Sequence, residues 1–174
     1  MSVAPVLETE RLVLRGHTLA DFPEVWANWR DPVTTRFVGG QPLSEEDSWT
    51  KMVRMIGHWH VMGFGYWIVR EKGTGRFLGE VGFADFRRTL EPSFEGAPEA
   101  GWVIAPWGHG KGIAREAVEA IHAWGKAKWG PVRTVCLIDP DNAPSLKLAD
   151  RMGYREYART AYKGAPVVLL ERLP

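Results

Sequence analysis

Apolar side chains repeat along the chain with two different periods, which separates expected strands from expected helices. Residues 11–15 alternate between apolar and polar, as a half-buried strand does. In residues 19–29 the apolar positions recur at helical spacing, and Asp31-Pro32 is expected to end that helix. A second helix is expected from Ser44, which three acidic residues follow, to about Met62.

The middle of the chain returns to the strand pattern. Residues 65–71 and 76–86 predict two strands that the turn KGTG joins into a hairpin. The polar segment 87–98 is long for a hairpin loop, and a fourth strand is expected at 99–106. The remaining expected elements are a helix over 112–128, a strand over 132–138, a short helix over 143–152, and strands near 154–162 and 165–172.

These elements follow the order β-α-α-β-β-β-α-β-α-β-β. Strands that are adjacent in the sequence predict antiparallel pairs. The strand–helix–strand step through Val103, Val118 and Val135 predicts one parallel pair with a right-handed crossover. We therefore expect an α/β (α+β) protein with a mixed seven-stranded sheet and a single domain over residues 1–174.

Composition narrows the class of protein. With 45% hydrophobic and 25% charged residues, the 174-residue chain is typical of a globular domain. A formal net charge of +1 gives no electrostatic reason to expect nucleic acid or a charged membrane as a partner. The single cysteine, Cys136, excludes an internal disulfide, and no secretory leader or long apolar run is seen, so a cytoplasmic protein is expected.

The stretch PWGHGKGIAREAV places Gly108, Gly110 and Gly112 directly before an expected helix. A glycine-rich turn at a helix start offers free backbone N–H groups and the positive end of the helix dipole, which together bind phosphate. Two known phosphate motifs do not fit. Gly112 stands where a P-loop needs Ser or Thr, and Ile113 stands where the dinucleotide fingerprint needs its third glycine.

Residues 109–114, HGKGIA, resemble the loop of the GNAT acetyltransferases, which has Gln or Arg, two residues, Gly, one residue, and Gly or Ala. Only His109 departs from it. The segment from Asp141 to Tyr154 also resembles the family, and ETERLVLR with FLGEVGF is similar to the RimJ/RimL-like branch of ribosomal-protein alanine acetyltransferases. The resemblance implies a single GNAT-type domain. It also implies acetyl transfer from acetyl-CoA to a primary amine, by direct attack through a tetrahedral intermediate. The acceptor would be a protein N-terminal α-amine or a small-molecule amine. The alternative is a non-catalytic acyl-CoA-binding module.

The same resemblance implies which residues contact acetyl-CoA. The amides of residues 109–114 would hold the pyrophosphate, the fourth strand would offer its backbone to the pantetheine arm, and Lys111 and Arg115 would add positive charge. The full set of cofactor-binding candidates is Trp102, Val103, Ile104, His109, Gly110, Lys111, Gly112, Ile113, Ala114, Arg115, Asn142 and Ser145.

The catalytic groups depart from the family pattern. Ala149 and Leu137 stand where many members carry a tyrosine acid and a glutamate base. Ser145 is therefore the candidate acid that protonates the leaving thiolate, or else only a hydroxyl near a helix start. Glu99 and Glu80 are the candidate bases, and each could point into the cleft or into water.

The acceptor side offers weaker signals. In this family the first two helices form the acceptor pocket, and here they carry Trp26, Trp29, Trp49 and Trp59 without an acidic cluster. This favours an apolar or peptide-like acceptor over a polycationic one, unless the rings only fill the core. No metal is expected, because His58 and His60 have the wrong spacing for a helical metal pair. A homodimer is an expectation from the resemblance alone.

Overall fold

A mixed eight-stranded sheet forms the centre of the protein in the computed structural model, which describes residues 4–174. The strand order is β1-β2-β3-β4-β5-β6-β8-β7. The strands are β1 (Leu7–Glu8), β2 (Leu12–Arg15), β3 (Tyr66–Glu71), β4 (Phe77–Ala84), β5 (Glu99–Ile104), β6 (Thr134–Ile138), β7 (Arg155–Tyr162) and β8 (Ala165–Arg172). All neighbouring strands are antiparallel except β5 and β6, which confirms the single parallel pair.

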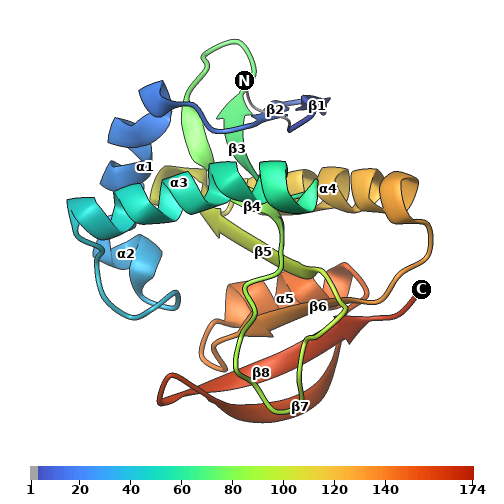
Figure 1. Ribbon diagram of the computed structural model, residues 1–174. Helices are drawn as coiled ribbons and strands as arrows, with labels where there is room; N and C mark the ends of the chain where they lie inside the picture. The colour runs from blue at the N-terminus through green and yellow to red at the C-terminus, as the bar shows by residue number, and fades with distance from the viewer. Residues whose placement is uncertain (1–3) are drawn as a thin grey trace.

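Helices cover both faces of the sheet. They are α1 (Phe22–Trp29), α2 (Pro32–Thr35), α3 (Glu45–Met62), α4 (Ile113–Trp129) and α5 (Ala143–Arg151), with short 3₁₀ turns at Leu19–Asp21 and Pro106–Gly108. Figure 1 shows α3 crossing in front of the strands and α4 behind them. The two faces are named here after these helices, as the α3 face and the α4 face.

Strand alternation sorts the side chains between the two faces. Ile68 and Val103 pack with residues of α1 and α3 in one hydrophobic cluster. Trp67 and Val81 pack with residues of α4 in the larger cluster, which Trp102 also contacts. Because successive strand residues point to opposite faces, each position on β4 and β5 can be assigned to one of them.

Two short elements correct the expected order. The predicted sheet of seven strands has eight, because Leu7 and Glu8 pair with Leu14 and Val13 to form β1. Two residues are too few to produce an alternating pattern. In addition, Asp31-Pro32 ends α1 as predicted but also begins α2, because the Asp31 carboxylate accepts a hydrogen bond from the Val33 amide and caps the new helix.

The long segment between β4 and β5 packs against the sheet. Leu90 and Phe94 are buried against Val135, Val167 and Leu169 of β6 and β8. In Figure 1 this segment runs in front of those strands, on the same side as α3. The α3 face is therefore covered by α1 and α3 over one half of the sheet and by the β4–β5 segment over the other.

Candidate active site

An opening between β5 and β6 lies at the centre of the candidate site. The two strands pair only at Glu99 and Val135, and the rest of β5 has no partner on that side. Beyond this pair, the edge of β5 from Trp102 to Ile104 therefore carries backbone groups that no strand satisfies. Such an edge can pair with an extended chain of amides in the manner of an added strand.

The N-terminus of α4 lies at the end of the same strand. Gly112 is its N-cap, with a left-handed φ of 75° and no side chain to cap the helix. The first amides of α4 thus lack both an intrahelical acceptor and a capping oxygen. Residues 109–114, the phosphate loop, form the anion-binding arrangement that the glycine pattern predicts.

Arg11, which the sequence analysis did not single out, holds this loop in place. Its guanidinium donates to the Lys111 carbonyl at 2.8 Å and to the Glu116 carboxylate of α4 at 2.6 Å. Glu116 also accepts hydrogen bonds from the Arg11 amide and the Thr9 hydroxyl. These bonds lower the pKa of Glu116 against the opposing effect of its burial. The start of β2 and the start of α4 are thus joined by a charged network beside the phosphate loop.

His109, the position that departs from the family loop, has a structural partner. Its Nε2–H donates to the Ile104 carbonyl at 2.7 Å and ties the loop to the end of β5. Of the two cations near the loop, Arg115 pairs with Glu119 one turn along α4 at 2.8 Å. Lys111 is exposed.

Asn142 and Ser145 meet at the start of α5. The Asn142 side chain caps the helix by accepting a hydrogen bond from the Ser145 amide at 3.2 Å. The Ser145 hydroxyl in turn accepts a hydrogen bond from the indole N–H of Trp102 at 3.2 Å. Since Trp102 belongs to β5, this bond joins the start of α5 to β5, and the half-buried serine lies beside that strand.

Glu80 lies on the α3 face and is 2% exposed. Its two carboxylate oxygens accept hydrogen bonds from His17 Nε2 at 2.7 Å and from Trp29 Nε1 at 2.6 Å. Burial alone would raise the pKa of Glu80, but the hydrogen bond and charge of His17, the charge of Lys51 and the Trp29 bond lower it. Glu80 is thus an ionised, buried carboxylate and not a solvated strand residue.

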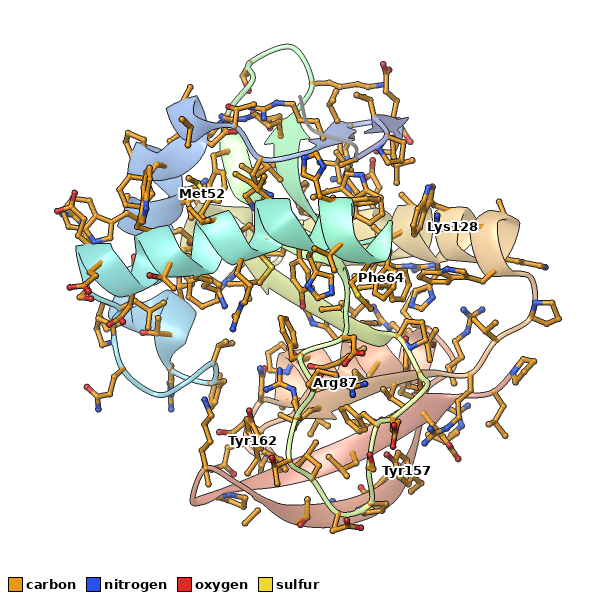
Figure 2. All side chains as sticks on the ribbon, viewed as in Figure 1. Met52, Phe64, Arg87, Lys128, Tyr157 and Tyr162 are labelled. Carbon is orange, nitrogen blue, oxygen red and sulfur yellow. The ribbon has the colours of Figure 1, made fainter. Side chains whose placement is uncertain are left out.

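Glu99 lies on the same face at the start of β5. Both of its oxygens are held by the Arg88 guanidinium, at 2.6 and 2.8 Å. Arg88 also lies over the rings of Phe86 and Tyr162, at 4.8 and 4.9 Å from their centroids. Figure 2 shows Tyr162 near the tip of the β7–β8 hairpin, below and to the left of Arg87 of the β4–β5 segment. Arg88 and Glu99 line a cavity of about 200 Å³ beneath that segment.

Tyr66 lies between these groups. A Cβ placed on Gly101 would come within 1.9 Å of the Tyr66 hydroxyl, so the hydroxyl rests directly on the β5 backbone. Burial and the nearby Glu99 carboxylate raise the pKa of Tyr66, which keeps its proton. Among the tryptophans, Trp29 and Trp59 are buried, whereas Trp49 is 43% exposed. Tyr154 is buried in the core, where its hydroxyl contacts Thr134 at 2.9 Å.

Comparison with known proteins assigns the chain to a protein family. Residues 11–155 match the family model of the acetyltransferase (GNAT) domain. The chain belongs to the GNAT acetyltransferases. The predicted mixed α/β GNAT domain is thus confirmed, as is the prediction of an N-acetyltransferase enzyme.

Several GNAT relatives resemble the whole chain. A GnaT-family acetyltransferase structure from Bordetella pertussis is 36% identical, covers 97% of this chain and 99% of its own, and superposes with a TM-score of 0.86. The curated N-acetyltransferase p20 of Bacillus licheniformis is 27% identical over 86% of this chain and 82% of its own. The ribosomal L7/L12 alpha-N-protein acetyltransferase RimL in complex with coenzyme A is 16% identical, covers 97% of this chain and 98% of its own, and shares the fold with a TM-score of 0.76.

Two other kinds of feature are absent from residues 4–174. None of the helices there is long and apolar enough to cross a membrane. No group of three or more His, Cys, Asp or Glu side chains in that range could hold a metal ion.

Three polar residues of the α3 face were missed by the sequence analysis. His17 lies two residues after Arg15, the last residue of β2, and so points to the same face. Tyr66 begins β3, and Lys51 lies one helical turn before Met55 on α3. Each is a single polar residue inside a predicted element or, for His17, just beyond one, so no motif marks it. The alternation of β2 does predict that Arg15 and His17 share a face, and this was the available signal for His17.

Proposed function

We propose that this GNAT enzyme transfers acetyl from acetyl-CoA to a primary amine that enters from the α3 face. The opening between β5 and β6 carries this proposal. Acetyl-CoA lies along the free edge of β5 with its pyrophosphate on the phosphate loop. The cofactor contacts are those expected of Trp102, Val103, Ile104, the loop from His109 to Ala114, Arg115 and Asn142. The amine attacks the thioester directly, and a backbone N–H of β5 near Ile104 stabilises the oxyanion of the tetrahedral intermediate.

Ser145 is the proposed acid of this reaction. Its hydroxyl accepts the Trp102 N–H, which leaves its own proton free to point into the opening. There it would protonate the departing thiolate of CoA. Glu80 and Glu99 are the proposed carboxylates of the amine side, and both lie on the α3 face of adjacent strands.

The acceptor class follows from the charges of that face. Both carboxylates there are already bonded to protein donors, so they offer no free anionic pocket for a polycation. The RimL relative is a ribosomal L7/L12 alpha-N-protein acetyltransferase, and we propose an N-terminal α-amine or a small-molecule amine as acceptor here. The proposal also places this chain in the RimJ/RimL-like branch of the GNAT family.

Ser145→Ala tests the chemistry. General acid catalysis contributes about 10²–10⁴-fold, so we expect kcat to fall by about 100-fold while the affinity for acetyl-CoA is retained. Trp102→Phe, which removes the indole N–H together with the five-membered ring but keeps the serine hydroxyl, should lower kcat less. An unchanged kcat in Ser145→Ala would show that Ser145 is only a helix-start residue. Acetyl-CoA binding without turnover of any amine would favour the binding-module alternative.

A further inference from the structure

The two carboxylates of the α3 face are poorly suited to take a proton from the acceptor directly. Glu80 accepts one donor on each oxygen, and its pKa is lowered. Glu99 is bound on both oxygens by Arg88. An acceptor ammonium must nevertheless lose a proton before its nitrogen can attack the thioester. Another group on this face has to receive it.

Lys51 of α3 is a basic group of this face that has no ionic partner. Its Nζ lies 4.1 Å from the centroid of the Trp29 ring. Within residues 4–174 it makes no ion pair and no hydrogen bond to protein, although it is only partly exposed. Trp29 in turn donates to Glu80 at 2.6 Å, and Glu80 is the register partner of Val103 on β5. A chain of direct contacts therefore connects the Lys51 amine to the strand beside which the thioester would lie.

The charges around Lys51 determine how readily it gives up its proton. Burial lowers the pKa of Lys51 to about 8, helped by Arg54 of α3 and Arg88 of the β4–β5 segment and opposed by Glu80 and Glu99. Trp29 of α1 also faces the Lys51 amine, but it contacts the amine only with its uncharged ring. A lysine with a pKa of about 8 has a free lone pair in about a fifth of the molecules at pH 7.4, whereas an ordinary surface lysine has one in only about a thousandth.

We propose that Lys51 is the proton acceptor for the incoming amine. This inference rests on the proposed function. The neutral Lys51 Nζ takes one proton from the acceptor ammonium and becomes an ammonium, and the acceptor becomes a neutral amine. That amine attacks the thioester carbonyl, the C–S bond breaks, and the thiolate takes the Ser145 proton. The attacking nitrogen loses its second proton as the amide forms, and this proton returns through water to the Ser145 oxygen. Lys51 then gives the first proton to solvent. Glu80 and Glu99 stabilise the protonated Lys51 by charge.

Two substitutions at Lys51 and a matched control test the assignment. Lys51→Met removes the amine, and Lys51→Arg keeps a positive charge that cannot be lost at working pH. The control is Lys128→Met, because the Lys128 Nζ also lies over a tryptophan, 5.4 Å from the Trp124 centroid, at the far end of α4 (Figure 2). All four proteins are assayed with acetyl-CoA and either a serine-initiated hexapeptide or phenethylamine, from pH 6 to about 9.5, the range around the usual lysine and histidine ionisations.

We expect both Lys51 variants to lose about 100-fold in kcat/KM for the amine near pH 8, with an unchanged Kd for acetyl-CoA. The wild-type kcat, measured with the amine saturating, should rise with pH and level off above the Lys51 pKa of about 8, and this ionisation should be missing from the profile of Lys51→Met. Lys128→Met should behave as wild type. If Lys51→Arg keeps its activity, Lys51 acts through its charge and not as a base, and the inference is wrong.

A readout without turnover separates this inference from the proposed function. In ¹³C NMR of the reductively methylated protein, with the Lys51 signal assigned from its loss in Lys51→Arg, Lys51 should titrate with a pKa near 8. Lys51 titrating with the surface lysines would contradict the inference. If wild type acetylates neither amine, the proposed function fails together with the base. If wild type is active and Lys51→Met is equally active, only the assignment of Lys51 fails.

Discussion

The buried carboxylate of Glu80 should contribute measurably to the stability of the fold. Its pKa is lowered although burial opposes the charged form, so its hydrogen bonds outweigh its desolvation. Glu80→Gln is a near-isosteric substitution that imitates the protonated acid. We therefore expect this substitution to destabilise the protein at neutral pH.

The magnitude follows from the two bonds that Glu80 makes. The glutamine oxygen can still accept the Trp29 N–H, and its NH₂ can face His17 only if the imidazole moves its proton to Nδ1. In the native protein Nδ1 is buried without a partner, so a proton there would be an unsatisfied donor. Replacing two charge-assisted bonds by neutral ones costs about 1–1.5 kcal/mol each, or about 2–3 kcal/mol together. The expected fall in Tm is about 4–12 °C for a domain of this size.

Urea unfolding at pH 7 measures this difference, with Glu119→Gln as the control. Glu119 is in an exposed pair with Arg115, and its loss should change the free energy of unfolding by less than about 0.5 kcal/mol. A carboxylate with a lowered native pKa stabilises above its unfolded pKa and loses that contribution as the pH falls through the native value. Glu80→Gln should therefore flatten the acid side of the stability profile. A Glu80→Gln protein as stable as wild type would refute the reasoning, because desolvation would then balance the bonds.

Two further substitutions test other parts of the site and core. Gly112→Ala forces a residue with a Cβ into a left-handed φ of 75°, which should lower the stability by about 1 kcal/mol and raise the Kd for acetyl-CoA. An unchanged Kd in calorimetry would argue that residues 109–114 do not bind the pyrophosphate. Burial and Arg172 lower the pKa of His122 to about 4, so between about pH 6.5 and 4 the unfolded chain binds a proton that the folded protein does not. As the pH falls through that window, the free energy of unfolding should therefore decrease by up to about 3 kcal/mol. His122→Gln should lose this dependence, and an equal slope in both proteins would mean that another group titrates.

Periodicity predicted the fold closely where elements were long. Residues 65–71 and 76–86 are short apolar stretches on either side of a turn and form β3 and β4, and the glycine before residue 113 starts α4. β1 was missed because two residues carry no period, and α2 was missed because Asp31-Pro32 signals the end of one helix and the start of another with the same residues. The parallel pair was predictable because the helix between the two strands returns the chain to the starting edge of the sheet, so that the second strand runs parallel to the first.

The cofactor side of the site was more predictable than the amine side. The phosphate loop is contiguous in sequence, so its glycines predict its geometry. The hydrogen-bond partners of Glu80 and Glu99 come from three separate segments, at His17, Trp29 and Arg88. Strand alternation leaves open which face a charged residue takes until the register is known. The sequence therefore indicated both carboxylates but not that each is saturated by protein donors.

Product analysis tests the central claim most directly, since that claim is acetyl transfer to an amine across the opening between β5 and β6. The protein is incubated with acetyl-CoA and the serine-initiated hexapeptide or phenethylamine, and CoA and N-acetylated product are quantified together by mass spectrometry. The account predicts equal amounts of CoA and acetylated amine from wild type, and about 100-fold slower formation of both by Ser145→Ala. Acetyl-CoA that binds but yields neither product, or CoA released without acetylated amine, would contradict it.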